Sequence, residues 1–185
     1  MDSNPEGPTM SSTHDPPPRD YRSSVPIPLD ITMVPIGFVR SPHTERHGTP
    51  RQPGIPGRGR ESAMEPSRIE LDSQRIPHLA LRDLDGFERI WVISYLHLNP
   101  NWGPLVRPPR GNRKRGVLST RSPHHPNPIG LSAVLLERIE GTSIHVRGLD
   151  LIDGTPVLDV KPYIPYCDAF TDSAAGWVDE LSDTP

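Results

Sequence analysis

The chain has 185 residues, of which 33% are hydrophobic and 25 are proline, and its formal net charge is −3. Proline occurs at more than twice its usual share of about 5%. Because proline is costly inside helices, a bundle of long helices and a coiled coil are excluded. No apolar run reaches the roughly 20 residues of a membrane-spanning helix. The length allows one core, and the composition favours a loop-rich domain that contains β-strands.

Cysteine usage and the first residues bear on the compartment of the protein. The single cysteine, Cys167, forms no intrachain disulfide and cannot by itself make a thiolate zinc site. The N-terminus is acidic and proline-rich, whereas a secretory signal carries a cationic and then an apolar stretch. We therefore expect a cytoplasmic protein.

The first 30 residues are rich in Pro, Ser and Asp and contain only scattered apolar side chains. Such a segment buries too little apolar surface to offset the entropy that it loses on ordering. We expect residues 1–30 to be disordered or extended. The alternative is a polyproline arm laid on a partner subunit, for which Pro16–Pro18 is suited. The folded domain is expected at residues 31–170, and an acidic tail at residues 171–185.

Runs of β-branched and aromatic residues locate the elements of the first half. The first run ends at Ser41-Pro42, and the nearly continuous apolar run Ile90–Leu96 predicts a strand that is buried on both faces. In chain order we expect a strand at residues 33–40, a long loop at 43–66, a short strand at 68–71, a short helix within 77–89 that stops near Gly86, and the strand at 90–96.

In the second half, strands are separated by turns. Glu140-Gly141-Thr142 is a hairpin signal and Asp153-Gly154 is a turn signal. Short strands at this spacing predict a mostly β fold, a small antiparallel sheet or barrel with one or two short helices and long Pro-rich loops. The expected strands are Gly116–Thr120, Leu131–Ile139, Ser143–Leu149 and Val157–Val160.

Three polar segments interrupt the strands: Pro50–Gly54, Ser119–Gly130 and Leu149–Pro156. Their prolines restrict the backbone and remove hydrogen-bond donors, so that the remaining polar groups are held at low entropic cost. Each segment taken alone is more often a plain connector or turn. Three of them in one small domain favour a binding or catalytic site.

The middle of the chain is locally cationic. Between Leu98 and Glu137 there is no acidic residue, and Trp102 offers a ring on which a base can stack. The stretch is either a solvated loop that is balanced by acids elsewhere or a surface that faces phosphates. The candidate nucleic-acid-binding residues are Arg107, Arg110, Arg113, Lys114 and Arg115.

The histidines and the cysteine lack the spacing of a metal or nucleophile site. Proline and glycine around His43 and His47 argue against the helix that would align them, and the adjacent His124 and His125 would diverge on an extended backbone. No Gly-x-Ser-x-Gly, Gly-x-Gly-x-x-Gly or phosphate-loop lysine motif is present, and Cys167 has no obvious neighbouring base. We expect no bound metal.

Six ordered blocks of the sequence match a known family: Gly37–Pro42, Pro50–Gly54, Leu84–Val92, Val106–Arg110, Thr120–Leu131 and Leu149–Tyr163. With these blocks the chain resembles the TsaA-like β-barrel family, which includes the TrmO-type methyltransferases, from Ile36 to about Phe170. The resemblance implies a small β-barrel that dimerises and binds S-adenosylmethionine close to the subunit interface. For TrmO-type members it implies methylation of N6 of threonylcarbamoyladenosine beside the tRNA anticodon.

The resemblance also implies where the cofactor is held, in the three polar segments and at the end of the strand at 90–96. Adenine needs backbone groups and an apolar wall, and the amino acid end needs a charge partner. The implied cofactor-binding residues are Arg51, Gln52, Pro53, His97, Leu98, Arg121, Leu131, Asp150, Leu151, Ile152, Asp153, Gly154 and Thr155.

A methyl sulfonium is already activated, so the protein has mainly to align the acceptor and to manage one proton. A carbamoylated amine is a weak nucleophile, which makes a base useful. Asp153, Asp159 or His124 is a candidate base, Lys161 is suited to polarise the carbamoyl oxygen, and Tyr163 or Tyr166 is suited to orient it. The catalytic candidates are His124, Asn127, Asp159, Lys161 and Tyr163.

One departure from the family concerns the acceptor, because His125 stands where TrmO-type proteins commonly have arginine. Two alternatives to tRNA methylation therefore stay open. The same chemistry on a small metabolite predicts activity without RNA and without a steep salt dependence. A non-catalytic module predicts binding of S-adenosylmethionine or RNA without turnover.

Overall fold

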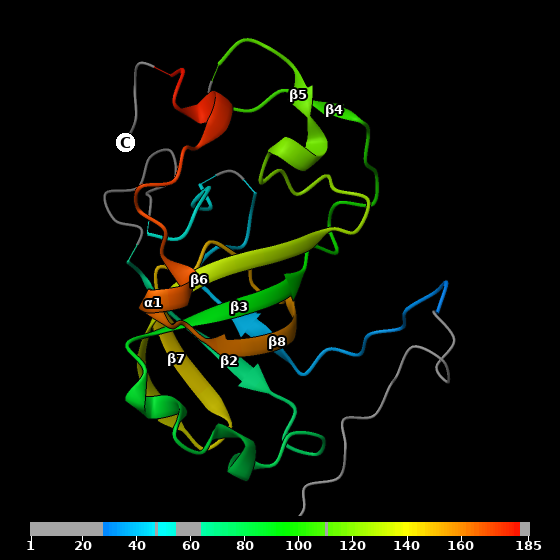
Figure 1. Cartoon of the computed structure of the whole chain (residues 1–185). Helices are drawn as coiled ribbons and strands as arrows, with labels where there is room; N and C mark the ends of the chain where they lie inside the picture. Colours follow the sequence, from blue (N-terminus) through cyan, green and yellow to red (C-terminus); the bar gives the residue numbers. More distant parts are fainter. Residues whose placement is uncertain (1–27, 47, 55–63, 110, 182–185) are drawn as a thin grey trace, which may run out of the picture. The chain divides into compact units, whose positions relative to one another are not determined.

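The computed structural model describes residues 28–46, 48–54, 64–109 and 111–181. The chain divides into two compact units, Met1–Thr32 and Met33–Pro185. Of the first unit, only residues 28–32 are described, and they contain no helix or strand. The disorder expected for residues 1–30 thus falls almost wholly outside the described residues. Every described strand and helix belongs to the second unit (Figure 1).

Six strands close into a barrel: β1 (Gly37–Arg40), β2 (Pro66–Leu71), β3 (Arg89–Tyr95), β6 (Ile129–Glu140), β7 (Ser143–Arg147) and β8 (Pro156–Pro162). Their order around the barrel is β1-β2-β7-β6-β3-β8, and each neighbouring pair is antiparallel. A separate two-stranded sheet pairs β4 (Leu105–Val106) with β5 (Arg115–Gly116) (Figure 1). The mostly β, antiparallel barrel expected from the sequence is confirmed.

Alternate residues along each strand point into the barrel, and their side chains fill its interior. In β3, Ile90, Val92 and Ser94 are fully buried, whereas Trp91 and Ile93, which alternate with them, are only partly buried on the outer face. The expectation that this strand is buried on both faces was wrong. A single-layered barrel has one interior, so the outer apolar residues of β3 face a surface rather than a second core.

Two expected elements differ from the structure. The single helix expected within 77–89 is two 3₁₀ helices, η1 (His78–Leu81) and η2 (Leu84–Gly86), because Asp83 between them adopts a left-handed φ of 66°. The strand expected at Gly116–Thr120 ends at Gly116.

The chain after Gly116 turns into η3 (Val117–Ser119), and the Thr120 hydroxyl donates to the Val117 carbonyl at 2.8 Å. Two short helices follow the barrel, α1 (Pro165–Asp168) and η4 (Gly176–Val178). None of the helices in the described ranges combines the length and the hydrophobicity needed to cross a bilayer.

Gly148, at the end of β7, lets the first polar segment dock on the barrel. The Gly54 amide donates to the Gly148 carbonyl at 3.3 Å. A Cβ atom on Gly148 would lie 3.4 Å from the Gly54 nitrogen and 3.3 Å from the Met64 sulfur, and the φ of Gly148 is +78°. Glycine therefore meets both demands, close backbone approach and a left-handed conformation.

Candidate functional site

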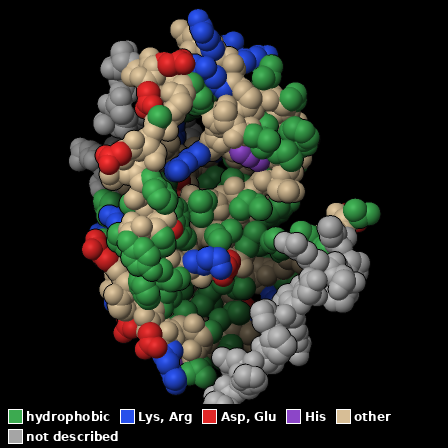
Figure 2. Space-filling model, in the orientation of Figure 1, with side chains coloured by type: hydrophobic (Ala, Val, Ile, Leu, Met, Phe, Trp, Pro, Cys, Tyr) green, Lys and Arg blue, Asp and Glu red, His purple; other side chains and the backbone are tan. Residues whose placement is uncertain are grey.

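The outer face of β3 and β6 carries a cavity of about 320 Å³. In antiparallel register, Trp91 lies opposite Ala133 and Ile93 lies opposite Leu131, so that these side chains share the outer face. Figure 2 shows hydrophobic side chains over this part of the barrel. The cavity is lined by Gln52, Pro53, Arg89, Trp91, Arg121, Leu131, Ala133 and Tyr163.

Trp91 forms a fixed wall of the cavity. Its indole nitrogen donates to the Asp168 carboxylate at 3.0 Å, and its ring centroid lies 5.4 Å from that of Tyr163. The Asp168 carboxylate also accepts the Ile164 amide at 2.8 Å, at the start of α1. The helix after β8 thus holds the Trp91 ring on the outer face of β3, and the Tyr163 ring packs against it.

Arg121 reaches the cavity from the rigid second polar segment. Side-chain to backbone hydrogen bonds fold this segment on itself: the Ser122 amide donates to the Thr120 hydroxyl at 3.3 Å, and a ring nitrogen of His125 lies 3.0 Å from the Thr120 carbonyl. At the far end, the Leu96 amide donates to the Pro128 carbonyl at 2.7 Å. The segment is therefore anchored on β3 beyond the cavity wall.

Asp150 is a partly buried carboxyl that stands near Arg121. Burial raises its pKa, whereas a hydrogen bond from the Ser132 hydroxyl and the charge of Arg121 act in the opposite direction. Ser132 points into the barrel between the cavity-lining Leu131 and Ala133. One stretch of β6 therefore both forms the cavity wall and supports the carboxyl behind it.

The other residues predicted in the third polar segment hold the barrel together. The Asp153 carboxylate accepts a hydrogen bond from the Ser41 amide at 3.1 Å, and the Gly154 amide donates to the Val39 carbonyl. The Thr155 hydroxyl donates to the Ile152 carbonyl at 2.6 Å. Leu151 is buried in the core. These contacts fix the turn against the end of β1, and cofactor binding by Leu151 to Thr155 stays a prediction.

Asp159 and Lys161 lie on the outer face of β8, and Tyr163 follows the last residue of that strand. Lys161 pairs in register with Trp91 and Asp159 with Ile93. The Lys161 ammonium contacts the Asp159 carboxylate at 2.7 Å, and the two side chains are 61% and 45% exposed. The pair is thus open to solvent and lies next to the strand that carries the cavity wall.

His124 is engaged at both ring nitrogens. Nε2 lies 3.2 Å from an Arg46 guanidinium nitrogen, and Nδ1 lies 3.2 Å from the Asn101 carbonyl. Because a guanidinium only donates and a carbonyl only accepts, both contacts are hydrogen bonds when Nδ1 donates and Nε2 accepts. Asn127 is exposed, and its carbonyl accepts the Ile129 amide at 2.8 Å. Among the described residues, no group of three or more His, Cys, Asp or Glu is placed to hold a metal ion.

The predicted nucleic-acid-binding residues do not share one environment. Arg107, Arg113 and Lys114 are exposed, whereas Arg110 lies outside the described residues. Arg115 is held by the C-terminal segment: its guanidinium contacts the Glu180 carboxylate at 3.1 Å and lies 5.0 Å from the centroid of the Trp177 ring. Figure 2 shows Lys and Arg side chains gathered at the end of the molecule that carries β4 and β5.

The cavity unites predicted residues that are distant in sequence and adds others that the sequence did not indicate. Of the predicted cofactor residues it brings together Gln52, Pro53, Arg121 and Leu131, whereas Arg51, His97 and Leu98 are exposed and are not part of its lining. Arg89, Trp91 and Ala133 were missed. Their signal was the alternation of β3 and β6, which was obscured by interpreting β3 as buried on both faces.

The chain is similar to known proteins over most of the described domain. The family described as the tRNA-methyltransferase O N-terminal domain matches residues 38–169. A mouse protein named tRNA (adenine(37)-N6)-methyltransferase is 43% identical over 138 residues, which are 73% of this chain and 31% of that protein. The Escherichia coli protein of the same name is 38% identical over 150 residues, 77% of this chain and 61% of the relative. The chain thus spans about a third to three fifths of these relatives.

Two further similar proteins are matched over a larger share of their own length. A probable S-adenosyl-L-methionine-binding protein of Pyrococcus abyssi is 35% identical over 83% of this chain and 79% of its own length. A crystal structure of TrmO superposes with a TM-score of 0.66 at 35% identity, covering 80% of this chain and 64% of that one. The family match over residues 38–169 and the similarity of fold agree, and the chain belongs to the family of tRNA-methyltransferase O N-terminal domains.

Proposed function

We propose that this chain methylates N6 of threonylcarbamoyladenosine beside the anticodon of tRNA, with S-adenosylmethionine as the methyl donor. The proposal rests on the outer cavity, in which Gln52 and Pro53 meet Arg121 and Leu131 although the two pairs come from distant parts of the chain. The names of the mouse and Escherichia coli relatives, tRNA (adenine(37)-N6)-methyltransferases, support the reaction and the substrate.

The residues around the cavity fit S-adenosylmethionine. Leu131 and Pro53 give an apolar wall for an adenine, and the Gln52 amide offers both a donor and an acceptor. The amino acid end of the cofactor carries one anion and one cation, and Arg121 and Asp150 form a neighbouring pair of opposite charges. When bound, the cofactor supplies a methyl group on a positively charged sulfur.

The chain must then accept the proton that leaves the acceptor nitrogen. Of the candidate bases, His124 has its unprotonated Nε2 directed at Arg46, and Asp153 accepts a backbone amide. Asp159 is solvent-exposed on the outer face of β8 and has Lys161 at 2.7 Å. We assign proton transfer to the Asp159 carboxylate, which would accept the proton of the acceptor nitrogen as the methyl group passes from the sulfur to that nitrogen. Lys161 then orients the carbamoyl oxygen.

The proposed partners are tRNA and a second copy of the chain. Arg107, Arg113 and Lys114 are exposed on the side of β4 and β5 and are suited to contact phosphates. For the homodimer, Tyr95 and Ile129 face each other across β3 and β6, next to Leu131, and are 44%, 47% and 53% exposed. A second copy would cover this patch beside the cavity. We place the protein in the cytoplasm, where tRNA and the cofactor meet.

The test is methyl transfer by the purified full chain. We expect label from methyl-labelled S-adenosylmethionine to appear in tRNA that carries threonylcarbamoyladenosine and not in tRNA without it, as measured by mass spectrometry of the nucleosides. Thermal shift with the cofactor alone separates binding from turnover. Cofactor binding without methyl transfer to tRNA would contradict the proposed reaction. The chain would then be a non-catalytic module that binds S-adenosylmethionine.

The dimer has its own test. Ile129→Arg places a charge in the apolar patch, and light scattering should then show a monomer where the unchanged chain is a dimer. Leu79→Arg is the matched control, because Leu79 is also exposed, at 62%, but lies in η1 away from β3 and β6. A monomeric unchanged chain would contradict the dimer.

A further inference from the structure

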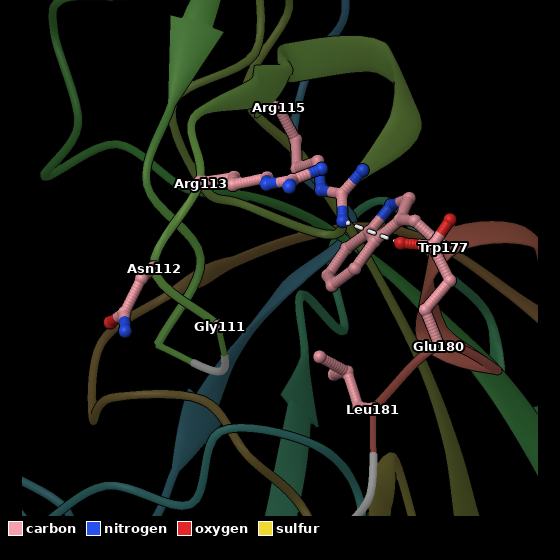
Figure 3. Close-up of a pocket in the computed structure, with 7 residues that line it drawn as sticks. All are labelled: Gly111, Asn112, Arg113, Arg115, Trp177, Glu180 and Leu181. Atoms are coloured by element: carbon pink, nitrogen blue, oxygen red, sulfur yellow. Dashed lines mark hydrogen bonds and ion pairs between the residues drawn. The ribbon is translucent and has the colours of Figure 1, made fainter.

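A second cavity lies between the β4–β5 sheet and the C-terminal segment. We propose that it binds one nucleotide of the substrate RNA, separate from the adenosine that is methylated, with the base against Trp177 and the phosphate on Arg113. Its volume is about 300 Å³, at the lower end of the range for small-ligand sites. It is lined by Gly111, Asn112, Arg113, Arg115, Trp177, Glu180 and Leu181 (Figure 3).

The Trp177 ring is held in place from two sides. Its indole nitrogen donates to the Ser119 carbonyl at 2.8 Å, and the Arg115 guanidinium lies 5.0 Å from its ring centroid. Arg115 is fixed in turn by Glu180 at 3.1 Å. A ring that is already ordered loses little entropy when a base stacks on it, so the contact is well suited to binding. Arg115 therefore acts mainly by positioning Trp177.

The charges in the cavity match one phosphodiester. Because Arg115 pairs with Glu180, the Arg113 guanidinium is the positive charge left in the lining. Among the residues that the structure describes, Arg113 and the adjacent Lys114 have no ion-pair partner. Figure 3 shows the Arg113 side chain extended toward Arg115, while the side chain of Asn112 points away. One free cation suits an internal phosphodiester, whereas a free mononucleotide has a more highly charged phosphate.

The Trp177 cavity is joined to the cavity of the proposed cofactor by a few residues of backbone. Ser119, which accepts the Trp177 bond, ends η3, and its own hydroxyl donates to the Gly116 carbonyl at 2.8 Å. Arg121, two residues on, lines the first cavity. A nucleotide on Trp177 would thus be held at a fixed place relative to the methyl donor. This inference rests on the proposed function for the identity of the RNA.

The experiment measures binding of a fluorescent tRNA anticodon stem-loop to the full chain by anisotropy. Base stacking is worth about one to three kcal/mol per base, so Trp177→Ala should weaken binding about tenfold. Trp177→Phe keeps a ring and should bind within about threefold of the unchanged chain. Arg113→Gln should lower the slope of log affinity against log salt by about one.

Two variants control for changes unrelated to the cavity. Phe170→Ala removes an aromatic ring that is 71% exposed, and Arg82→Gln removes an exposed cation near η1. Both should bind the stem-loop like the unchanged chain. In the methylation assay, Trp177→Ala should raise KM for tRNA and leave the rate at saturating tRNA unchanged.

The outcomes separate this inference from the proposed function. Equal binding by Trp177→Ala and the unchanged chain overturns the inference, and so does equally weak binding by the Ala and Phe variants. Binding of free AMP as tight as that of the stem-loop assigns the cavity to mononucleotides and also overturns it. A chain that binds RNA through Trp177 but transfers no methyl group overturns the proposed function alone.

Discussion

The hydroxyl of Ser132 supports a carboxyl that burial makes costly to ionise. Ser132→Ala removes the donor to Asp150, and a hydrogen bond to a charged group contributes about 1.5–3 kcal/mol. We expect a loss of about 2 kcal/mol at neutral pH, which lowers the Tm of a domain of roughly 150 residues by about 4–8 °C.

The loss should depend on pH. Burial raises the pKa of Asp150, so the folded chain still binds a proton where the unfolded chain has released it. Stability from this group is therefore highest at low pH and falls as pH rises from the ordinary value of about 3.9 to the raised one. Ser132→Ala should raise the pKa of Asp150 further. Its cost should be smaller in acid, about 1 kcal/mol, where the carboxyl is neutral.

The assay is urea denaturation at a series of pH values from about 4 to 8. Ser94→Ala is the control, because Ser94 is equally buried and its hydroxyl has no hydrogen-bond partner in the described structure. This control should show little loss and no pH dependence. In an Asp150→Asn background, the cost of Ser132→Ala should shrink. A cost that is equal at all pH values would refute the proposed support of Asp150.

Four further variants test the site and the barrel. Asp159→Ala and Lys161→Ala should each lower methyl-transfer turnover at least tenfold and leave the calorimetric Kd for S-adenosylmethionine nearly unchanged; unchanged turnover in both would remove them from the mechanism. Arg121→Ala should weaken that Kd about tenfold or more, because it removes the proposed charge partner of the cofactor carboxylate, and equal affinity would exclude this role. Gly130→Ala should cost about 1–3 kcal/mol in urea denaturation, because its Cβ would lie 2.4 Å from the Ser94 hydroxyl; Ser94→Ala should relieve part of this cost.

The sequence predicted the barrel well because its strands follow alternation and its turns carry glycine. Gly141, with φ of 61°, makes the β6–β7 turn where the hairpin signal placed it. The sequence did not reveal which side of β3 is buried, since Trp91 and Ile93 are as apolar as the neighbouring core residues Ile90 and Val92. Burial of the outer face depends on neighbours from distant segments, and no local pattern records these.

Only part of the candidate site could be predicted, because its residues come from segments that are distant in the sequence. The stiff polar loops indicated two of the segments that form the site, the family resemblance indicated Gln52 and Arg121 within them, and the structure brings both residues to one cavity. Trp177 carried no signal. It stands in a C-terminal stretch without periodicity, and its bond to Ser119 spans 58 positions along the chain. Contacts of this range follow from the closed fold rather than from local sequence preference.

Adjacent residues of β6 have different roles, because they face opposite sides of the strand. Leu131 and Ala133 line the outer cavity, while Ser132 and Val134 point into the barrel. Mutational tolerance along these four positions should therefore alternate, with substitutions at 131 and 133 altering ligand affinity at normal protein abundance and those at 132 and 134 lowering abundance itself. Selection for ligand affinity and selection for stability therefore act on alternate residues of this strand. A shift of the strand register by one residue would exchange the two sets and damage both properties.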